Sequence, residues 1–330
     1  MNELKSTINA LAVAGKGILA ADESIGTISK RFAALHIPCT EETRRNYREL
    51  LLTTPDLEKA IAGVILFEET LGQKTSKGIS FPELLKQNQI IPGIKVDKGL
   101  VSLPGTDEKS TQGLDGLAER LQAYKKQGAR FAKWRAVFAI TDKTPSRLAI
   151  QTNAEDLARY AAICQANGIV PIIEPEVLID GTHTLEQCFN VSEAVLNCVF
   201  HKLYKHQVLL EYIILKPSMV TSGKDCTVQA NHQAIAEATI TMLKRTVPAA
   251  VPTINFLSGG QTPLEATQNL NAMHQVQPSL PWNLSFSFAR ALQEPCMAAW
   301  LGKGENVRIA QEIFLKQAKM NSFASLGKYV

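Results

Sequence analysis

Three lysines stand where short apolar runs end, which is where a strand would end. They are Lys95, Lys133 and Lys216, and Lys216 follows the run Tyr212-Ile-Ile-Leu215. Apolar walls and neighbouring cations disfavour the charged form of an amine, so we expect the pKa of at least one lysine to fall until the amine is nucleophilic. A free amine condenses with a ketone to form an imine. We predict that Lys216 is this nucleophile; the alternative is a lysine that only extends its amine to solvent.

Carboxylates occupy similar positions. Glu174 and Glu176 flank Pro175 after another apolar run, and the alternation of side chains along a strand would send both to the same side. One of two neighbouring carboxyls tends to stay protonated, which suits an acid that delivers and removes water during imine formation. Asp22 could take a proton from a substrate hydroxyl. For Glu174 and Glu176 the alternative is an ordinary charged Glu-Pro-Glu turn. For Asp22 the alternative is a helix cap, but we expect Ser24 to be the cap.

Two segments near the C-terminus have residue types that bind phosphate. Leu257-Ser-Gly-Gly260 contains glycines that allow close approach of the backbone to an anion. Arg290 follows Ser285-Phe-Ser-Phe-Ala289, and its guanidinium can hold two phosphate oxygens. They follow the seventh and eighth apolar runs, where barrels of alternating strands and helices often bind phosphate. Together they predict a phosphate site, which neither segment indicates by itself.

No metal site is predicted. The sequence has six histidines: His36, His183, His201, His206, His232 and His274. None of them is among the polar residues that end the apolar runs. The only close pair, His201 and His206, is five residues apart, whereas a spacing of three or four would put both on one helix face. We interpret all six as surface or capping residues. Trp134, between Lys133 and Arg135, is interpreted as a packing residue.

The elements that position these residues are eight short apolar runs, each followed by a longer amphipathic segment. The runs cover residues 17–22, 62–68, 91–97, 130–135, 169–174, 208–216, 251–258 and 282–290. Helical periodicity covers residues 114–124, 154–164, 185–203, 234–243 and 306–320. This alternation predicts parallel strands covered by helices.

Eight strands favour closure into a barrel over an open sheet. Polar residues end nearly every run: Asp22, Glu68, Lys95, Asp97, Lys133, Arg135, Glu174, Glu176, Lys216, Ser258 and Arg290. Side chains from so many strands can converge only around a closed mouth, which is where barrel active sites are built. We therefore predict one α/β domain over residues 1–330, a (β/α)8 TIM barrel with an N-terminal helical segment at 1–16 and a C-terminal helix and tail at 305–330.

Composition excludes several other classes of protein. Of 330 residues, 45% are hydrophobic and 20% are charged, so the chain folds. Its 35 basic and 31 acidic residues include no run of five like charges, so nucleic acid is not expected as a partner. No run of 18 apolar residues indicates a membrane span, and the first fifteen residues do not have the pattern of a targeting signal. Six cysteines without a CxxC pair are typical of reduced thiols in the cytoplasm.

Seven segments resemble, in order, the motifs of the class I (Schiff-base) fructose-1,6-bisphosphate aldolases. They are GKGILAADES (15–24), GVILFEET (63–70), GIKVDKG (93–99), FAKWR (131–135), GIVPIIEPE (168–176), LKP (215–217) and FLSGGQ (256–261). The resemblance runs from about Leu11 to Tyr329. Seven ordered motifs are far more specific than any one of them.

The resemblance implies reversible cleavage of fructose 1,6-bisphosphate to dihydroxyacetone phosphate and glyceraldehyde 3-phosphate, in glycolysis and gluconeogenesis, with no metal or other cofactor. Lys216 would form the imine with dihydroxyacetone phosphate. Glu174 would be the acid and base for carbinolamine formation and dehydration, and Lys133 would assist. Asp22 would take the C4 hydroxyl proton during C3–C4 cleavage, and Glu176 would support the lysines.

The same resemblance implies two phosphate sites. The 1-phosphate would be held by Ser258, Gly259, Ser287 and Arg290. The 6-phosphate end would be lined by Thr27, Arg31, Lys95 and Arg135. The family is commonly a cytosolic homotetramer, so we expect the same of this chain.

The sequence departs from the family pattern at three places. Thr27 stands where many relatives have serine, and Ala289 replaces the glycine usual before the phosphate arginine, where a methyl group could tighten the loop. The family's tail normally continues beyond a Gly-Lys-Tyr stretch to a tyrosine that aids proton exchange at the enamine carbon. Here Gly327-Lys-Tyr-Val330 ends the sequence, and we do not assign that role to Tyr329. We expect either that the tail is lost or trimmed, or that another group protonates the enamine.

Two alternatives stay open at this point. The chain could be another imine-forming sugar-phosphate aldolase or a transaldolase, or it could be a non-catalytic scaffold of the same fold. The complete set of polar residues at the ends of the runs argues against the scaffold. The preference between fructose 1,6-bisphosphate and fructose 1-phosphate is also left open.

Overall fold

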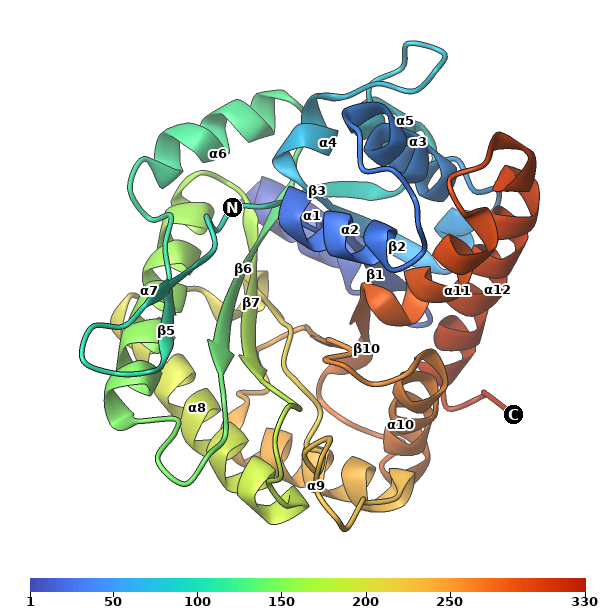
Figure 1. Ribbon diagram of the computed structural model, residues 1–330. Coiled ribbons are helices and arrows are strands. Elements are labelled where there is room, and N and C mark those ends of the chain that lie inside the picture. The colour runs from blue at the N-terminus through green and yellow to red at the C-terminus, as the bar shows by residue number, and fades with distance from the viewer.

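Eight strands, mostly of apolar and β-branched residues, pair in parallel and close into a barrel in the computed structural model, which describes residues 1–330 (Figure 1). Around the barrel the order is β1, β2, β3, β6, β7, β8, β9 and β10, which pairs with β1 again. The strands are β1 (Gly17–Ala21), β2 (Ile61–Leu66), β3 (Ile91–Lys95), β6 (Phe131–Phe138), β7 (Val170–Val177), β8 (Ile214–Leu215), β9 (Thr253–Phe256) and β10 (Asn283–Phe288). The predicted (β/α)8 barrel is confirmed.

Helices surround the strands and follow them in the chain (Figure 1). They are α2 (Ile25–Ala33), α3 (Glu41–Leu52), α4 (Glu68–Gly72), α5 (Phe81–Gln87), α6 (Leu117–Lys126), α7 (Arg147–Ala166), α8 (Leu185–Lys205), α9 (His232–Thr246), α10 (Pro263–Val276), α11 (Arg290–Trp300) and α12 (Val307–Ala324). Single 3₁₀ turns occupy Leu57–Lys59, Leu210–Tyr212 and Gly304–Asn306. No helix is both long enough and apolar enough to span a membrane.

Most of the longer helices begin at a residue whose side-chain oxygen satisfies a free backbone N–H, which is why they start where they do. The caps are Ser24 (α2), Thr40 (α3), Ser80 (α5), Ser146 (α7), Thr184 (α8), Asn231 (α9) and Thr262 (α10). The expected cap at Ser24 is confirmed, because its hydroxyl accepts a hydrogen bond from the Thr27 backbone N–H at 3.3 Å. At Thr184 and Thr262 a reciprocal capping box forms.

The alternation of side chains along the strands divides the core into two clusters. Residues that face the helices, such as Leu19, Ala132 and Ile173, belong to a cluster of 74 buried residues. A smaller cluster of 11 fills the end of the barrel interior next to α1 (Asn2–Leu11) and combines residues of that helix with strand residues: Leu4, Ile8, Leu11, Ile18, Ala20, Ala62, Ile65, Phe131, Val170, Ile172 and Ile214. The lower half of the barrel interior is therefore packed with apolar side chains, as is usual in this fold.

Helix α1 (Asn2–Leu11) covers the N-terminal end of the barrel. It packs on β2, β3 and β7 through Leu4, Ile8 and Leu11, which belong to the inner cluster. Phe131 fills the floor of the barrel, and a Cβ added at Gly93 would lie 2.3 Å from its ring. With one end closed in this way, the C-terminal end of the strands is the open mouth.

Two elements differ from the sequence prediction. The predicted strand at residues 208–216 is wrong for most of its length: Leu210–Tyr212 form a 3₁₀ turn and only Ile214–Leu215 pair as β8. The Gln165 side chain holds this turn, because it donates to the Leu209 carbonyl at 2.8 Å and accepts from the Leu209 N–H at 2.9 Å. An antiparallel hairpin, β4 (Leu100–Ser102) with β5 (Lys109–Thr111), was not predicted, since its strands are short and largely exposed.

Candidate active site

The inward positions of four strands change from apolar to charged near the mouth. On β6 and β7, Phe131 and Ile172 are followed two residues later by Lys133 and Glu174. The same step leads from Ala20 to Asp22 and from Ile214 to Lys216, just beyond β1 and β8. Because the direction of the side chains repeats every two residues along a strand, all four charged groups are directed toward the barrel axis.

These four side chains form one buried cluster. The Lys133 Nζ lies 2.8 Å from Asp22 Oδ2 and 3.1 Å from Glu174 Oε2, and the Lys216 Nζ lies 2.9 Å from Glu174 Oε1. Each residue is less than a tenth exposed, at 7% for Asp22, 4% for Lys133 and Glu174 and 3% for Lys216. Glu174 therefore bridges both lysines and is within direct proton-transfer distance of Lys216.

Charge pairing decides the protonation of this cluster. Burial raises the pKa of Asp22, but Lys133 and Lys216 outweigh burial and hold it well below its usual range. Burial also opposes ionisation of Glu174, yet the same two lysines leave its pKa lowered. Burial favours neutral Lys133, but Asp22 and Glu174 raise the pKa of this amine above its usual value. In the folded protein, then, Asp22 and Glu174 are carboxylates and Lys133 is a cation.

The expectation that one of Glu174 and Glu176 stays protonated is not met at Glu174, whose pKa is lowered. The two side chains do point to the same side, but each has its own cation: Glu176 pairs with Arg135, while Glu174 pairs with the two lysines. The two lysines beside Glu174 stabilise its charged form and lower its pKa. The sequence showed the spacing of the carboxylates and not these partners.

The lowered pKa of Asp22 predicts how acid affects stability. A carboxylate whose pKa is lower in the folded chain stabilises it above about pH 4, and the stabilisation is lost as pH falls. Between pH 7 and pH 3 we expect wild type to lose about 1 kcal/mol more unfolding free energy than Asp22→Asn. Urea denaturation at several pH values measures this, with Asp142→Asn, an exposed site, as control. Equal losses in wild type and Asp22→Asn would contradict it.

A second pair of cations lies around this cluster. Lys95 pairs with the buried Asp97, and Arg135 pairs with Glu176. Their side chains are more accessible than those of the inner lysines, at 16% for Lys95 and 35% for Arg135, against 4% for Lys216. They are thus the cations that an anionic substrate arriving from solvent can reach.

The two predicted phosphate segments lie side by side. After β9, Gly259 and Gly260 have φ of +46° and +88°, which side chains rarely adopt. A Cβ at Gly260 would lie 3.6 Å from an Arg290 Nη, which places the arginine beside the loop. Arg290 is the exposed first residue of α11. At the end of β10 the Ser287 hydroxyl is buried without a hydrogen-bond partner, so it is available to a ligand oxygen.

Alanine at Gly260 is expected to raise KM about tenfold, because positive φ costs a non-glycine residue about 1 kcal/mol or more. The added Cβ would also lie only 2.7 Å from Ile179 Cγ2. Steady-state kinetics measure the effect. The control is Gly72→Ala in α4, where no atom lies within 4 Å of the added Cβ. An unchanged KM in Gly260→Ala would remove this loop from the substrate site.

A chain of amide hydrogen bonds holds the predicted phosphate loop after β9 in place, which the sequence did not reveal. The Asn269 amide of α10 donates to Gln261 Oε1 at 2.7 Å, and its own oxygen lies 2.6 Å from Nδ1 of His232. The Leu257 N–H donates to the Pro217 carbonyl at 3.1 Å, next to Lys216. The phosphate loop is thus tied to the segment that carries the predicted nucleophile.

Thr27 and Arg31, the other residues expected at a phosphate, lie on α2 directly after β1. The exposed Thr27 hydroxyl is 3.1 Å from the Ser24 hydroxyl, and Arg31 forms an ion pair with Glu23. Glu68, by contrast, begins α4 and contacts Lys98 at 3.0 Å and the Tyr124 hydroxyl at 2.7 Å. It belongs to the rim of the barrel and not to the lysine cluster.

Two further interpretations can be compared with the structure. Trp134 is fully buried and stacks on Tyr160 at 5.5 Å between ring centroids, so its interpretation as a packing residue is confirmed. The interpretation of all six histidines as surface or capping residues is wrong for His183, which is 4% exposed and has no partner for either ring nitrogen. Burial lowers its pKa. No three His, Cys, Asp or Glu side chains are grouped so that they could hold a metal ion.

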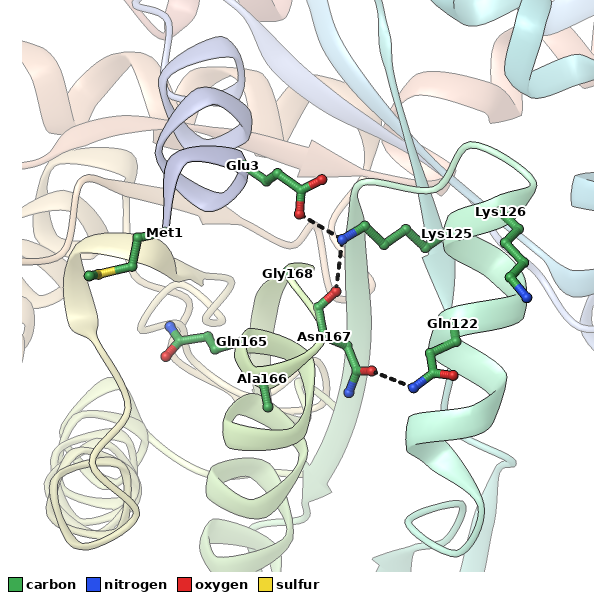
Figure 2. Close-up of a pocket in the computed structure, with 9 residues that line it drawn as sticks. All are labelled: Met1, Glu3, Gln122, Lys125, Lys126, Gln165, Ala166, Asn167 and Gly168. Atoms are coloured by element: carbon green, nitrogen blue, oxygen red, sulfur yellow. Dashed lines mark hydrogen bonds and ion pairs between the residues drawn. The ribbon is translucent and has the colours of Figure 1, made fainter.

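An open pocket at the opposite end of the barrel is separate from this site. Figure 2 shows it between the start of α1 and the C-terminal ends of α6 and α7. Several of its polar groups already have partners: the Lys125 Nζ donates to Glu3 at 2.7 Å and to the Asn167 carbonyl at 3.1 Å. The charged cluster and the phosphate loop lie at the other end, where strands give way to loops.

The mouth of this (β/α)8 barrel holds a buried amine beside a carboxylate, a second carboxylate, and a glycine loop next to an arginine. These are the components that an imine-forming enzyme of phosphorylated substrates requires. Residues 3–330 match the family model described as fructose-bisphosphate aldolase class-I. The chain belongs to this family, and it is therefore an aldehyde-lyase. The family resemblance seen in the sequence motifs is confirmed.

Individual relatives are similar over almost the whole chain. Cytosolic fructose-bisphosphate aldolase 5 of Arabidopsis thaliana is 57% identical over 99% of this chain and 92% of its own length. Fructose-bisphosphate aldolase B of Gallus gallus is 54% identical over 97% of this chain and 88% of its own. A crystal structure of the Plasmodium falciparum aldolase, in complex with TRAP and an inhibitor, has a TM-score of 0.98 at 52% identity, covering 100% of this chain and 95% of that one.

Proposed function

We propose that this aldolase cleaves fructose 1,6-bisphosphate through an imine on Lys216. The observation that carries the proposal is the contact of 2.9 Å between the Lys216 Nζ and Glu174 Oε1, with both side chains buried. An ammonium cannot attack a carbonyl, so a base must first remove its proton. Glu174 is ionised and in contact, and it is therefore the base available for this step.

The same carboxyl then acts as an acid. Once Glu174 has taken the Lys216 proton, the free amine attacks the C2 carbonyl and forms a carbinolamine. Glu174 returns its proton to the carbinolamine hydroxyl, which leaves as water and leaves a protonated imine. Lys133, 3.1 Å from Glu174, remains a cation and stabilises the negative oxygen during these steps. The lowered pKa of Glu174 thus fits a residue that works first as a base.

Cleavage of the C3–C4 bond requires a second base. Asp22 is ionised and lies 2.8 Å from Lys133, so in our proposal it takes the proton of the C4 hydroxyl. The C3–C4 electron pair moves to the iminium nitrogen, giving an enamine, and glyceraldehyde 3-phosphate leaves. Protonation of the enamine at C3 and hydrolysis of the imine release dihydroxyacetone phosphate. The protonated imine accepts the electron pair, so no metal or other cofactor is needed in this scheme.

The remaining predicted residues are proposed to bind the two phosphates and to support the lysines. The 1-phosphate is assigned to Ser258, Gly259, Ser287 and Arg290, which the loop geometry and the unpartnered Ser287 hydroxyl support. The 6-phosphate end is assigned to Thr27, Arg31, Lys95 and Arg135, which include three cations. Glu176 holds Arg135 in place beside the cluster.

Reductive trapping tests the nucleophile. Dihydroxyacetone phosphate and borohydride should together convert the imine to a stable secondary amine, and peptide mapping should find the added mass on Lys216 and nowhere else. A label on another lysine would overturn the mechanism. Absence of any label from folded protein would favour the non-catalytic scaffold.

Resistance to chelation is a further expected result. Because the imine supplies the electron sink, activity should stay within about twofold after dialysis against EDTA, whereas a metal-assisted lyase would lose its Lewis acid. The remaining activity is measured as the release of both triose phosphates in a coupled assay. Loss of activity that returns with added Zn²⁺ or Mg²⁺ would contradict an imine mechanism.

We also propose that the protein acts in the cytoplasm, in glycolysis and gluconeogenesis, as a homotetramer. The support is the family and the names of cytosolic relatives, together with six free cysteines. Light scattering should then give a mass four times that of the 36.1 kDa chain. A monomer mass would remove the oligomer from the proposal and leave the chemistry intact.

A further inference from the structure

Glu23, the residue after Asp22, is buried among three donors. Its Oε1 accepts hydrogen bonds from Arg31 and, at 2.9 Å, from the Gln293 side-chain amide. Its Oε2 accepts from Arg48 Nη2 at 2.6 Å. The Glu23 side chain is only 3% exposed. A buried carboxylate must keep its partners, because an unpaired charge in the interior is strongly unfavourable.

The two arginines differ in where they can reach. The Arg31 side chain on α2 is 21% exposed, whereas that of Arg48 on α3 is 4% exposed and cannot contact a substrate in solvent. One Nη of Arg48 is buried with no partner of its own. Gln293 on α11 is held by the Ala20 carbonyl at 2.7 Å and by the Tyr47 hydroxyl at 3.1 Å. Helices α3 and α11 therefore hold Glu23 from the protein side, and Arg31 is the only one of its three partners that reaches solvent.

We propose that Arg48 is a positioning residue for the 6-phosphate. It acts through Glu23: because Arg48 and Gln293 already satisfy this carboxylate, Arg31 can exchange Glu23 for the phosphate without leaving a buried charge unpaired. One carboxylate against two guanidiniums also leaves a net positive charge beside the mouth. The inference rests on the proposed function, since that function assigns Arg31 to the 6-phosphate end.

The proposed role of Arg48 concerns only the 6-phosphate end of the substrate, so it can be measured by comparing substrates with and without that phosphate. Without Arg48, Glu23 would have Arg31 as its only cation and would hold it away from the phosphate. Fructose 1-phosphate has no 6-phosphate, so its binding should not depend on whether Arg31 is free. A purely structural role of Arg48 would affect both substrates alike.

The test compares KM and kcat for the two sugars in Arg48→Met and in Arg48→Lys. Arg48→Met should raise KM for fructose 1,6-bisphosphate about tenfold and leave both constants for fructose 1-phosphate within about twofold. Arg48→Lys keeps the charge and should stay near wild type. In the double variant Glu23→Gln with Arg48→Met, Arg31 has no carboxylate to hold it, so KM for the bisphosphate should return to within about threefold of wild type.

Several results would overturn the inference. They are an unchanged bisphosphate KM in Arg48→Met, an equal loss on both sugars, or no recovery in the double variant. If Arg48→Met does not fold, the Gln293→Leu variant removes the other protein-side donor to Glu23. This variant should raise KM about threefold for fructose 1,6-bisphosphate and not for fructose 1-phosphate. An unchanged KM for the bisphosphate would overturn the inference. Two other results would instead show that the proposed function fails. They are a wild-type protein that cleaves neither sugar, or an Arg31→Ala variant whose KM for fructose 1,6-bisphosphate is unchanged.

Discussion

Replacing Lys216 with methionine is expected to lower turnover of fructose 1,6-bisphosphate by at least roughly 10⁴-fold, because no imine can then form. Methionine has a similar length and is apolar, so it suits a side chain that is 4% exposed between β7 and β9. The substitution removes the amine and leaves Glu174 its second partner, Lys133. The release of triose phosphates measures turnover, and trapping with borohydride should give no adduct.

The matched control is Lys126→Met. Lys126 is an exposed lysine on α6, at the pocket on the opposite end of the barrel (Figure 2), and its replacement should leave turnover within about twofold. Circular dichroism checks that both variants are folded. Folded Lys216→Met that keeps a hundredth of wild-type turnover, or that still forms an adduct, would assign the nucleophile to another residue.

Replacing Glu174 with glutamine is expected to lower kcat about 10²- to 10³-fold with a smaller change in KM. The amide keeps the shape of the side chain but cannot take the Lys216 proton or return it to the carbinolamine. The defect should therefore appear in imine formation. Rapid-quench trapping with borohydride measures that step, and its rate should fall together with kcat.

Glu155→Gln is the control for Glu174→Gln. Glu155 is also a carboxylate paired with a lysine, at 2.8 Å from Lys202, but it lies on α7, outside the mouth. The Glu155→Gln substitution should change kcat by less than about twofold. A Glu174→Gln enzyme that forms the imine at the wild-type rate would show that another group transfers these protons.

Much of the fold and of the charged cluster could be predicted because both depend on local periodicity. A strand repeats every two residues, so the sequence Phe131-Ala-Lys-Trp-Arg135 already puts its two cations on one face and Trp134 on the other. The structure agrees, with Trp134 packed on Tyr160 and Lys133 in the cluster. The parallel order then brings the strand ends to one mouth.

Prediction was wrong where long-range contacts outweigh local pattern. The apolar run at 208–216 resembles a strand, but hydrogen bonds to Gln165 hold part of it as a 3₁₀ turn. His183 looked like a surface residue because nothing in the sequence shows that the loops after β7 and β8 bury it. The spacing of Glu174 and Glu176 indicated that one of them stays protonated, whereas the two lysines beside Glu174 lower its pKa.

The sequence by itself determined the alternation of strands and helices, the caps of the helices and the charged residues at the strand ends. Those features follow from the steric periods of the backbone and from side chains that bond to neighbouring residues. Only the tertiary structure decided which charge meets which, and with that the protonation of the site. Glu23 and Gln293 are 270 positions apart and touch only because the barrel closes. Electrostatic energy depends on distance and burial in the folded chain, and neither can be read from spacing along it.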